Sequence, residues 1–247
     1  MTALSHFHET DPSGLQTLDR FAQATHFNQW LFETIFPFCT GHVLEAGSGI
    51  GNLSSFFLEK KILLTASDLR DEYCNILHSK FGRHPSLQGI LSIDLAVHDF
   101  EHRYASLTGK FNTVVALNVI EHIQDDHLAI ANCKKLLAPG GNLVILVPAY
   151  RTLYNSLDEE LGHYVRYTRK TLKKLLASEK LSIIHSQYFN AAGIAGWFMN
   201  GLLFHKRIIP RKQLQLFDKL IPFMKLVDTI TFYRIGLSVI AVGRNST

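Results

Sequence analysis

From about residue 42 onward, short runs of apolar residues alternate with stretches whose apolar residues recur at helical spacing. A continuous apolar run is typical of a strand buried on both faces, and such strands form parallel sheets that helices cover. The alternation therefore predicts an α/β fold with a mostly parallel sheet. The seven expected strands are residues 42–46, 62–67, 89–94, 113–117, 143–147, 181–186 and 237–242. The main expected helices are residues 52–61, 71–81, 123–137 and 168–178.

The rest of the chain fits around this sheet without a second domain. We expect a single domain over residues 1–247, with an N-terminal helical extension over 1–40 and a helical cap insert over 190–236, before the last strand. Ala138-Pro-Gly-Gly141 predicts a turn between the long helix and the fifth strand.

Composition excludes several classes of protein. Hydrophobic residues make up 47% of the 247 residues and charged residues 19%, which is ordinary for a globular protein and wrong for a disordered or fibrous one. The net charge of +4, spread evenly, is too weak a field to indicate nucleic acid, so no nucleic-acid partner is expected.

The three cysteines, Cys39, Cys74 and Cys133, are too few and too dispersed for a disulfide framework or a zinc site. The first 14 residues contain neither the basic nor the apolar segment of a signal peptide. The longest charge-free stretch, residues 181–205, holds too many polar side chains for a transmembrane helix. We therefore expect a cytoplasmic protein, and the spacing of its histidines predicts no metal site.

A glycine-rich loop follows the first expected strand directly. It reads Gly47-Ser48-Gly49-Ile-Gly51, and Glu45 precedes it by two positions. Glycines at a strand-to-helix junction let the backbone turn sharply and approach a ligand, toward which the amides of the following helix point. Such a loop predicts a nucleotide-like ligand, although dinucleotide-binding folds use a similar device.

Polar residues follow the next three strands at the points where those strands end. Asp68 lies 17 residues after the last loop glycine, Asp94 ends the third strand, and Asn118 follows the fourth. Open α/β sheets bind ligands at the carboxyl ends of their strands, where a carboxylate can accept ribose hydroxyls. Each residue alone is as compatible with a helix cap or a loop, but together with the glycines they favour a ligand site.

These motifs resemble those of class I S-adenosylmethionine-dependent methyltransferases, in the same order along about residues 25–247. The matching segments are Leu44–Gly51, Ser67-Asp68-Leu69, Asp94-Leu95, Asn118-Val-Ile-Glu-His122 and Leu137–Gly141. The resemblance implies a Rossmann-like sheet with a reversed final hairpin and S-adenosyl-L-methionine as cofactor. It also implies the site residues: Glu45, Gly47, Ser48, Gly49 and Gly51 for the methionine moiety, Asp68 and Leu69 for the ribose, Asp94 and Leu95 for the adenine, and Asn118 beside the methionine end. His122 is a second candidate for a catalytic base, but we expect it to pack near the cofactor at the start of a helix.

Within that class the chain is similar to bacterial methyltransferases found near, or fused to, glycosyltransferases of surface-glycan and lipid pathways. Three segments carry this similarity: Phe27-Asn28-Gln-Trp30, Asp158–Tyr167 and Gly236–Arg244. It implies a small-molecule acceptor that is linked to a glycan or a lipid.

Methyl transfer to a hydroxyl needs a group that removes the hydroxyl proton. We expect His163 to be that base, because it lies in a polar segment after the fifth strand and its ordinary pKa of about 6.5 suits the task. Arg166 and Tyr167 are expected to bind the acceptor, or to pin their loop through Asp158. Trp30 is either a lid over the methionine end or a core anchor.

Oxygen is the expected target atom, although nitrogen and carbon stay open. The segment after the fourth strand, Asn118-Val-Ile-Glu, lacks the Asn/Asp-Pro-Pro-aromatic motif of enzymes that methylate the amino groups of adenine or cytosine. The acceptor itself and the oligomeric state stay open, as do two other functions. One is a nicotinamide-dependent oxidoreductase, which the glycine spacing disfavours, and the other is a non-catalytic nucleotide-binding module.

The expected insert concentrates the basic charge of the chain. Seven of the 25 Lys and Arg residues but only two of the 21 Asp and Glu residues lie in residues 196–235, so this segment carries +5 and the remainder −1. Its many aliphatic and aromatic residues suit either a cap packed over the active site or a segment lying on an anionic membrane. We favour the cap, and we expect any membrane contact of this segment to be peripheral.

Overall fold

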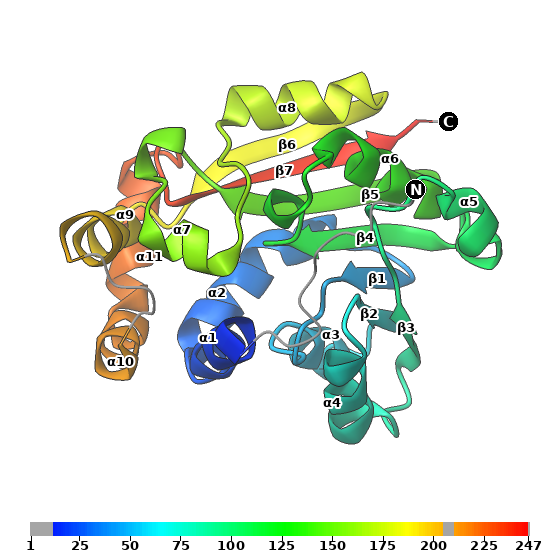
Figure 1. The fold of residues 1–247 in the computed structure, drawn as a ribbon, viewed down its shortest axis with the longest axis horizontal. Helices are drawn as coiled ribbons and strands as arrows, with labels where there is room; N and C mark the ends of the chain where they lie inside the picture. The colour runs from blue at the N-terminus through cyan, green and yellow to red at the C-terminus, as the bar shows by residue number, and fades with distance from the viewer. Residues whose placement is uncertain (1–11, 205–209, 247) are drawn as a thin grey trace.

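The computed structural model describes residues 12–204 and 210–246. It contains a seven-stranded, mostly parallel sheet with helices on both faces, which confirms the expected fold class (Figure 1). The expectations for residues 1–11 of the N-terminal extension, and for Lys206 and Arg207 of the insert, lie outside the described residues. The strands are β1 Val43–Ala46, β2 Leu64–Asp68, β3 Leu87–Ser92, β4 Phe111–Leu117, β5 Leu137–Pro148, β6 Leu181–Phe189 and β7 Ser238–Asn245.

The strands lie in the order β3-β2-β1-β4-β5-β7-β6. β1 pairs in parallel with β2 on one side and with β4 on the other, so the chain winds outward in both directions from this point. β7 runs antiparallel between β5 and β6, which confirms the reversed final hairpin. Ligands of open α/β sheets bind at the carboxyl ends of the strands where the winding reverses, here β1 and β4.

Neighbouring residues of the central strands face opposite sides of the sheet and build two separate cores. Val114 of β4 packs into one core with residues of α6 and α8, whereas Val115 packs into the other with residues of α2, α3 and α11. Both valines are fully buried, as the continuous apolar runs predict. The helices are α1 Pro12–Ala22, α2 Thr25–Ile35, α3 Ser54–Glu59, α4 Asp71–Phe81, α5 Phe100–Arg103, α6 Asp126–Leu136, α7 Ser156–Leu161, α8 Arg169–Ser178, α9 Gly193–Trp197, α10 Arg211–Lys219 and α11 Ile221–Ile230.

The turn expected at 138–141 lies inside a strand instead of before it. β5 begins at Leu137, and its pairing with β4 shifts register, so that Phe111 pairs with Leu137 but Thr113 with Asn142. The four intervening residues bulge out of the ladder, with Gly140 at a left-handed φ of 77°. The turn chemistry was therefore predicted correctly, but the strand resumes on both sides of it because the backbone finds partners in β4 there.

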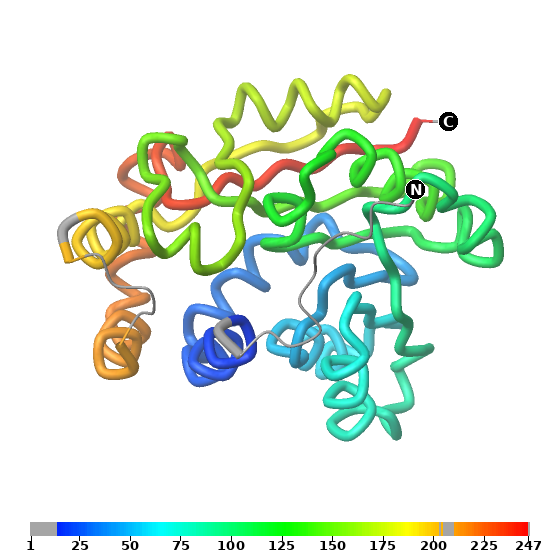
Figure 2. Tube along the Cα trace, viewed as in Figure 1, coloured from blue at the N-terminus to red at the C-terminus, as the bar shows by residue number. Residues whose placement is uncertain are grey.

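The connection from β6 to β7 is helical and lies beside the N-terminal helices, although the two are far apart in the sequence (Figure 2). Its two acidic residues point inward. The carboxylate of Asp228 accepts the backbone N–H groups of Asn190 and Ala191, each at 2.7 Å, and Asp218 accepts the N–H of Phe27 at 2.8 Å. These bonds attach α11 to the end of β6 and α10 to the start of α2.

We expect the substitution Asp228→Asn to lower the free energy of unfolding by roughly 1–3 kcal/mol, because the amide has one acceptor oxygen and leaves one buried N–H unsatisfied. Urea denaturation followed by circular dichroism measures the change. Asp19→Asn is the matched control, since Asp19 forms an exposed ion pair with Arg211 and its substitution is expected to change stability by less than about 0.5 kcal/mol. Equal losses in the two variants would contradict this role of Asp228.

Candidate functional site

A cavity of about 450 Å³ lies at the carboxyl ends of the central strands, within the size range of small-ligand sites. Its walls come from the loops after β1, β2, β3 and β4, from the N-terminal helices, and from the connection between β6 and β7. Its lining includes many of the expected site residues: Glu45, Gly47, Ser48, Gly49, Asp68, Leu69, Asp94, Leu95, Asn118, His122, His163 and Arg166. The expected residues Trp30, Gly51 and Tyr167 are not among the lining residues.

The glycine loop has the backbone conformation that its sequence predicts. Gly47, Gly49 and Gly51 have φ angles of 75°, 54° and 86°, in the left-handed region that side chains disfavour. A Cβ atom on Gly47 would collide with Val119, and one on Gly51 would collide with Phe81 of α4. Gly51 therefore serves the close packing of the loop against α4, whereas the two earlier glycines face the cavity.

Glu45 lies at the floor of the cavity, at the end of β1. Its carboxylate accepts the hydroxyl of Ser54, and its backbone carbonyl accepts the hydroxyls of Ser48 and Ser67 at 3.1 and 3.0 Å. Burial raises the pKa of Glu45 to about 7, although the serine hydrogen bonds act in the opposite direction.

Asp68 connects the end of β2 to the glycine loop. Its Oδ2 accepts the N–H of Gly49 at 2.9 Å and its Oδ1 accepts the N–H of Arg70 at 3.1 Å. Burial raises the pKa of Asp68, while the backbone hydrogen bonds lower it. Since each carboxylate oxygen has two lone pairs, the carboxylate can still accept a ligand hydroxyl in the cavity.

Two further residues lie where the motif order predicts, with small differences in the backbone. β3 ends at Ser92, two residues before Asp94, whose Oδ1 instead accepts the N–H of Ala96 at 2.8 Å and orders the loop. Asn118 has a left-handed φ of 53°, and its N–H donates to the carbonyl of Leu146 at 2.8 Å. This strained conformation, which costs about 1–2 kcal/mol for a residue other than glycine, is held where Asn118 faces the cavity.

At the other end of the cavity a buried carboxylate organises the loop after α7. Oδ1 of Asp158 lies 2.7 Å from Nδ1 of His163 and accepts a hydrogen bond from Nε of Arg166 at 2.7 Å. Its Oδ2 accepts the N–H of Asn155 at 3.0 Å. Burial alone would raise the pKa of Asp158, but the hydrogen bonds and charges of His163 and Arg166 outweigh it and hold the pKa below its usual value. The aspartate thus holds His163 with Nε2 free for other partners.

Arg166 is fixed on three sides. Besides Asp158, its guanidinium donates to the carbonyl of Ala149 at 2.8 Å and lies 4.7 Å from the ring centre of Trp197. Both interpretations that the sequence left open for Arg166 are compatible with this arrangement, because the residue pins the loop and also lines the cavity.

Two expected site residues belong to the core instead. Tyr167 is 3% exposed, and its hydroxyl donates to Asp126 at 2.8 Å. Trp30 is 5% exposed, with its ring centre 4.3 Å from that of Phe189. The core-anchor interpretation of Trp30 is therefore the one that the structure has, and the expected acceptor contact of Tyr167 is corrected. In both cases burial of the large ring stabilises its place in the core.

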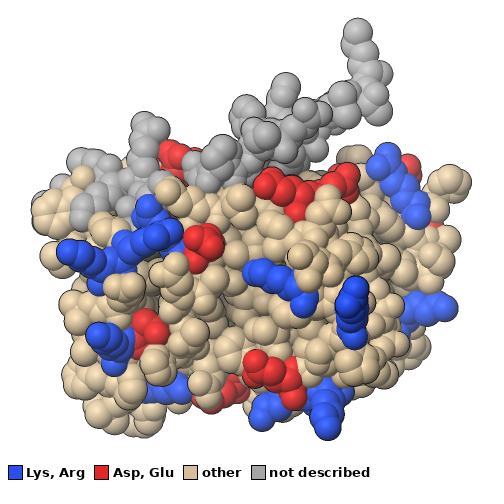
Figure 3. Space-filling model, turned by 90° about the horizontal axis from the view of Figure 1, so that it is seen from below, with Lys and Arg blue, Asp and Glu red and all other residues tan. Residues whose placement is uncertain are grey.

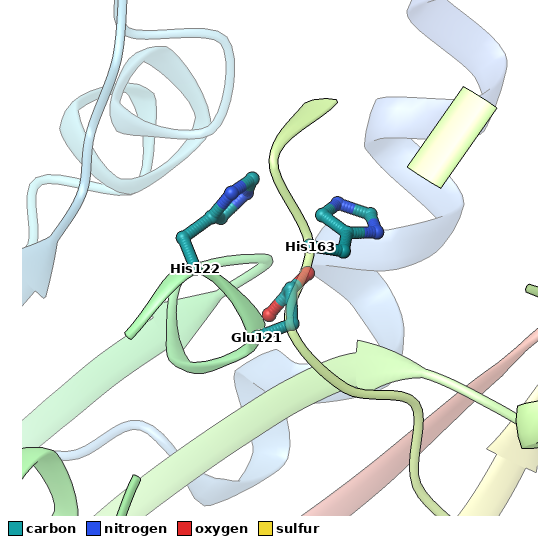
Figure 4. Close-up of side chains that lie close together, drawn as sticks. All are labelled: Glu121, His122 and His163. Carbon is teal, nitrogen blue, oxygen red and sulfur yellow. The ribbon is translucent and has the colours of Figure 1, made fainter. Parts of the chain in front are cut away.

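Glu121 and His122 lie in the short turn η3, Ile120–His122, close to His163 on the facing loop (Figure 4). The rings of His122 and His163 have centres 4.7 Å apart at 72°. Burial, together with the charges of His163 and Arg70, lowers the pKa of His122 to about 3. Burial raises the pKa of Glu121 to about 8, and neither of its carboxylate oxygens has a hydrogen-bond partner among the described residues.

Several cavity residues were not expected from the sequence. Trp197, Asn200 and Phe217 reach the cavity from the connection between β6 and β7, and Arg70 from the loop after β2. Glu121 was quoted only as part of a motif. Its turn follows β4 directly, which is the signal that could have marked it, but spacing alone does not tell which side chain of a turn points inward.

Comparison with known proteins gives a family. Residues 17–200 match the family model described as "Methyltransferase domain". A ubiquinone biosynthesis O-methyltransferase of Xanthomonas oryzae pv. oryzae is 33% identical over 103 residues, which cover 42% of this chain and 41% of the relative. The chain thus matches about two fifths of the length of such curated relatives.

Solved structures show the same fold at low identity. A chain of the complex between the Haloferax volcanii Trm112 methyltransferase activator and the putative methyltransferase is 12% identical with a TM-score of 0.64, covering 96% of this chain and 99% of that one. The Haemonchus contortus phosphoethanolamine N-methyltransferase 2, in complex with phosphomonomethylethanolamine and S-adenosylhomocysteine, is 14% identical with a TM-score of 0.62, covering 99% of this chain and 61% of that one.

The substitution Asp158→Asn is expected to lower the free energy of unfolding by about 3–5 kcal/mol, because it leaves the guanidinium of Arg166 buried without its carboxylate. Thermal and urea unfolding measure the loss. Asp99→Asn removes a carboxylate from an exposed pair with Arg103 and serves as the control, with no measurable change in stability expected. A variant of Asp158 as stable as the control would refute the organising role of this carboxylate.

Proposed function

Because the chain belongs to the methyltransferase domain family and uses S-adenosylmethionine as its cofactor, we propose that it methylates a hydroxyl oxygen of a small-molecule acceptor that is linked to a lipid or a glycan. The family membership sets aside the nicotinamide-dependent oxidoreductase that the sequence left open. One observation carries the proposal. A single cavity holds the glycine loop and Asp68 at one end and the Asp158–His163 pair at the other.

The first end fits the cofactor. Gly47 and Gly49 have no side chain where the cofactor would approach the backbone, and Asp68 keeps lone pairs that can accept the ribose hydroxyls. Asp94 and Leu95 line the pocket expected for the adenine, and Glu45, Ser48, Asn118 and His122 line the pocket toward the methionine end. When bound, the cofactor supplies the methyl carbon: the acceptor oxygen bonds to it, the carbon–sulfur bond breaks, and its electron pair stays on sulfur.

At the second end, His163 activates the acceptor hydroxyl. Its Nδ1 proton is held by Asp158, which leaves the Nε2 lone pair for chemistry in the cavity. A lone pair so placed either accepts the hydroxyl proton directly, as the sequence suggests, or binds a cation that makes the hydroxyl more acidic. Arg166 and Trp197 form the adjacent wall, where they position the acceptor.

Two observations support an oxygen target and an amphiphilic acceptor. Curated relatives that match part of the chain are named O-methyltransferases, and the segment after β4 lacks the motif of enzymes that methylate adenine or cytosine amino groups. The part of the cavity lining that comes from α1, α2, α9 and α10 is largely apolar, which suits a hydrocarbon part of the acceptor: Leu18, Phe21, Phe27, Leu31, Trp197, Leu214 and Phe217.

Two substitutions at opposite ends of the cavity are expected to affect different steps, one the binding of the cofactor and the other the transfer of the methyl group. Asp68→Asn weakens S-adenosylhomocysteine binding by about tenfold or more, because a charged acceptor of hydrogen bonds is worth about 1.5–3 kcal/mol. His163→Ala keeps this affinity but lowers methyl transfer by roughly 100-fold or more. Calorimetry with S-adenosylhomocysteine measures the first, and transfer of labelled methyl groups to bacterial lipid extracts and nucleotide sugars measures the second.

His127→Ala is the control, since His127 is an exposed histidine paired with Glu179, away from the cavity. It is expected to match the wild-type protein in both assays. Failure of the wild-type protein to bind S-adenosylhomocysteine would contradict the cofactor site, and unchanged turnover of His163→Ala would remove His163 from the mechanism.

We also propose that residues 190–236 cap the cavity of a single domain, with residues 1–40 as its N-terminal extension, and that the cap rests on an anionic membrane to receive its acceptor. Along α10 and α11 the two acidic residues are buried, whereas Arg211, Lys212 and Lys219 are exposed. Basic side chains gather where α10 lies, at the left of the face in Figure 3. Large apolar side chains that are 45–74% exposed occur in the same stretch of the chain: Leu216, Leu220, Phe223, Leu226, Ile230, Phe232 and Ile235.

Exposed apolar side chains flanked by unopposed basic ones are typical of segments that lie in the interface of an anionic bilayer. Lys225 forms an ion pair with Glu33 of α2 at 2.8 Å and Arg211 one with Asp19 of α1 at 3.5 Å, so part of the basic charge attaches the cap to the N-terminal helices. No helix within the described residues is long and apolar enough to span a membrane.

We expect the protein to float with vesicles of phosphatidylcholine and phosphatidylglycerol at low salt, and to stay behind with phosphatidylcholine alone or at high salt. Each basic residue near an anionic surface contributes about 1 kcal/mol. The double substitution Leu216→Ser and Phe223→Ser is expected to reduce flotation, whereas Leu63→Ser, an exposed apolar residue between α3 and β2, leaves it unchanged. Protein that stays at the bottom of the gradient with both vesicle types would rule out membrane contact.

A further inference from the structure

Three potential metal ligands converge at the acceptor end of the cavity. One carboxylate oxygen of Glu121 and one ring nitrogen each of His122 and His163 lie within 4.8 Å of one another. Figure 4 shows Glu121 and His122 on the turn after β4 and His163 on the facing loop. Two ligands of one cation with bonds near 2.2 Å lie at most about 4.4 Å apart, so a small rotation of the side chains brings all three onto a single ion.

Glu121 is the ligand without another explanation. It is fully buried, and neither carboxylate oxygen has a hydrogen-bond partner among the described residues. A buried carboxylate without a partner is costly to ionise, and a cation bound beside it lowers that cost. The nearby guanidinium of Arg166 already forms its ion pair with Asp158. Both carboxylate oxygens of Glu121 are therefore available to bind a cation from outside the chain.

The two histidines are oriented as metal ligands usually are. Nδ1 of His163 is held by the buried carboxylate of Asp158 at 2.7 Å, which directs Nε2 toward the cavity. A carboxylate on the second nitrogen is the usual outer-shell partner of a metal-binding histidine, because it sets the tautomer and makes the ligand more basic. The ring of His122 packs against that of His163, with ring centres 4.7 Å apart.

We propose that Glu121, His122 and His163 bind one divalent transition-metal cation. Two imidazoles and one carboxylate are a ligand set of zinc, manganese and iron sites, and three protein ligands leave positions open for another molecule. Both histidines line the cavity, while Glu121 closes the site from behind. The open positions therefore face the place proposed for the acceptor.

This inference rests on the proposed methyl transfer to oxygen and names the means by which His163 acts. A cation beside the acceptor lowers the pKa of the acceptor hydroxyl, whose proton leaves to solvent, so that the oxygen becomes the nucleophile. No electron is exchanged with the cation. The Nε2 lone pair is then a ligand and not the base that receives the proton, which replaces the expectation from sequence that the chain has no metal site.

The test measures the ion directly. The full chain, purified without a metal-affinity tag and stripped with a chelator, is titrated calorimetrically with Zn²⁺ and Mn²⁺, and its visible spectrum is recorded with Co²⁺. We expect one ion per chain. Glu121→Gln, which keeps the shape of the side chain, is expected to weaken binding by more than about 100-fold, beyond the 10–100-fold effect of an outer-shell partner. His127→Ala, in the exposed pair with Glu179, keeps wild-type affinity.

S-adenosylhomocysteine binding, measured on the same samples, shows that each variant is folded. Stripped wild-type protein is expected to bind S-adenosylhomocysteine and to lose methyl transfer, which Zn²⁺ or Mn²⁺ restores. Absence of stoichiometric binding, or equal affinity in wild type and Glu121→Gln, would overturn the metal site. Methyl transfer to oxygen that persists after stripping would do the same and leave the proposed function standing. One bound ion without methyl transfer to any oxygen acceptor would instead retain the site and refute the proposed function.

Discussion

The parallel pairing of β1 with β2 on one side and β4 on the other is the constraint on which the cavity depends. It brings the carboxyl ends of the central strands to one edge of the sheet, where each strand is followed by a loop. The chain leaving β1 turns at Gly47 and Gly49 with left-handed φ angles, and the amide of Gly49 then meets Asp68 from β2. After β4, Asn118 adopts the same backbone region. Residues far apart along the chain thereby share one cavity.

Two buried carboxylates lie at the acceptor end, one with hydrogen-bond partners for its oxygens and one without. Asp158 accepts hydrogen bonds from Arg166 and Asn155 and contacts His163, so its charge is compensated inside the protein. Glu121, equally buried, has no such partner among the residues that the structure describes. The first carboxylate holds the loop in place, and the second has two oxygens that a cation could bind.

The insert shows why net charge becomes informative only once the side chains are placed. From composition, its acids and bases simply add. In the structure Asp218 and Asp228 turn inward, where they accept backbone N–H groups of α2 and of the end of β6. The exposed charge on α10 and α11 is therefore more basic than the count suggests, and it lies beside exposed apolar side chains. Two of the bases also fasten the insert to the N-terminal helices, so the same residues serve attachment and surface chemistry.

Local patterns along the chain were enough to predict the sheet, the helix over residues 71–81, and the presence of Asp68 and the glycine loop at one edge. All of these depend on hydrophobic periodicity or on residues that directly follow a strand. The acceptor end depended on long-range contacts. Tyr167 and Glu121 point inward because the direction of a side chain in an irregular segment is set by what packs against it. Trp30 lies in the core because tertiary contacts decide which face of α2 is buried. Trp197 contacts Arg166 from the insert, whose position in the chain could be predicted from sequence but whose packing could not.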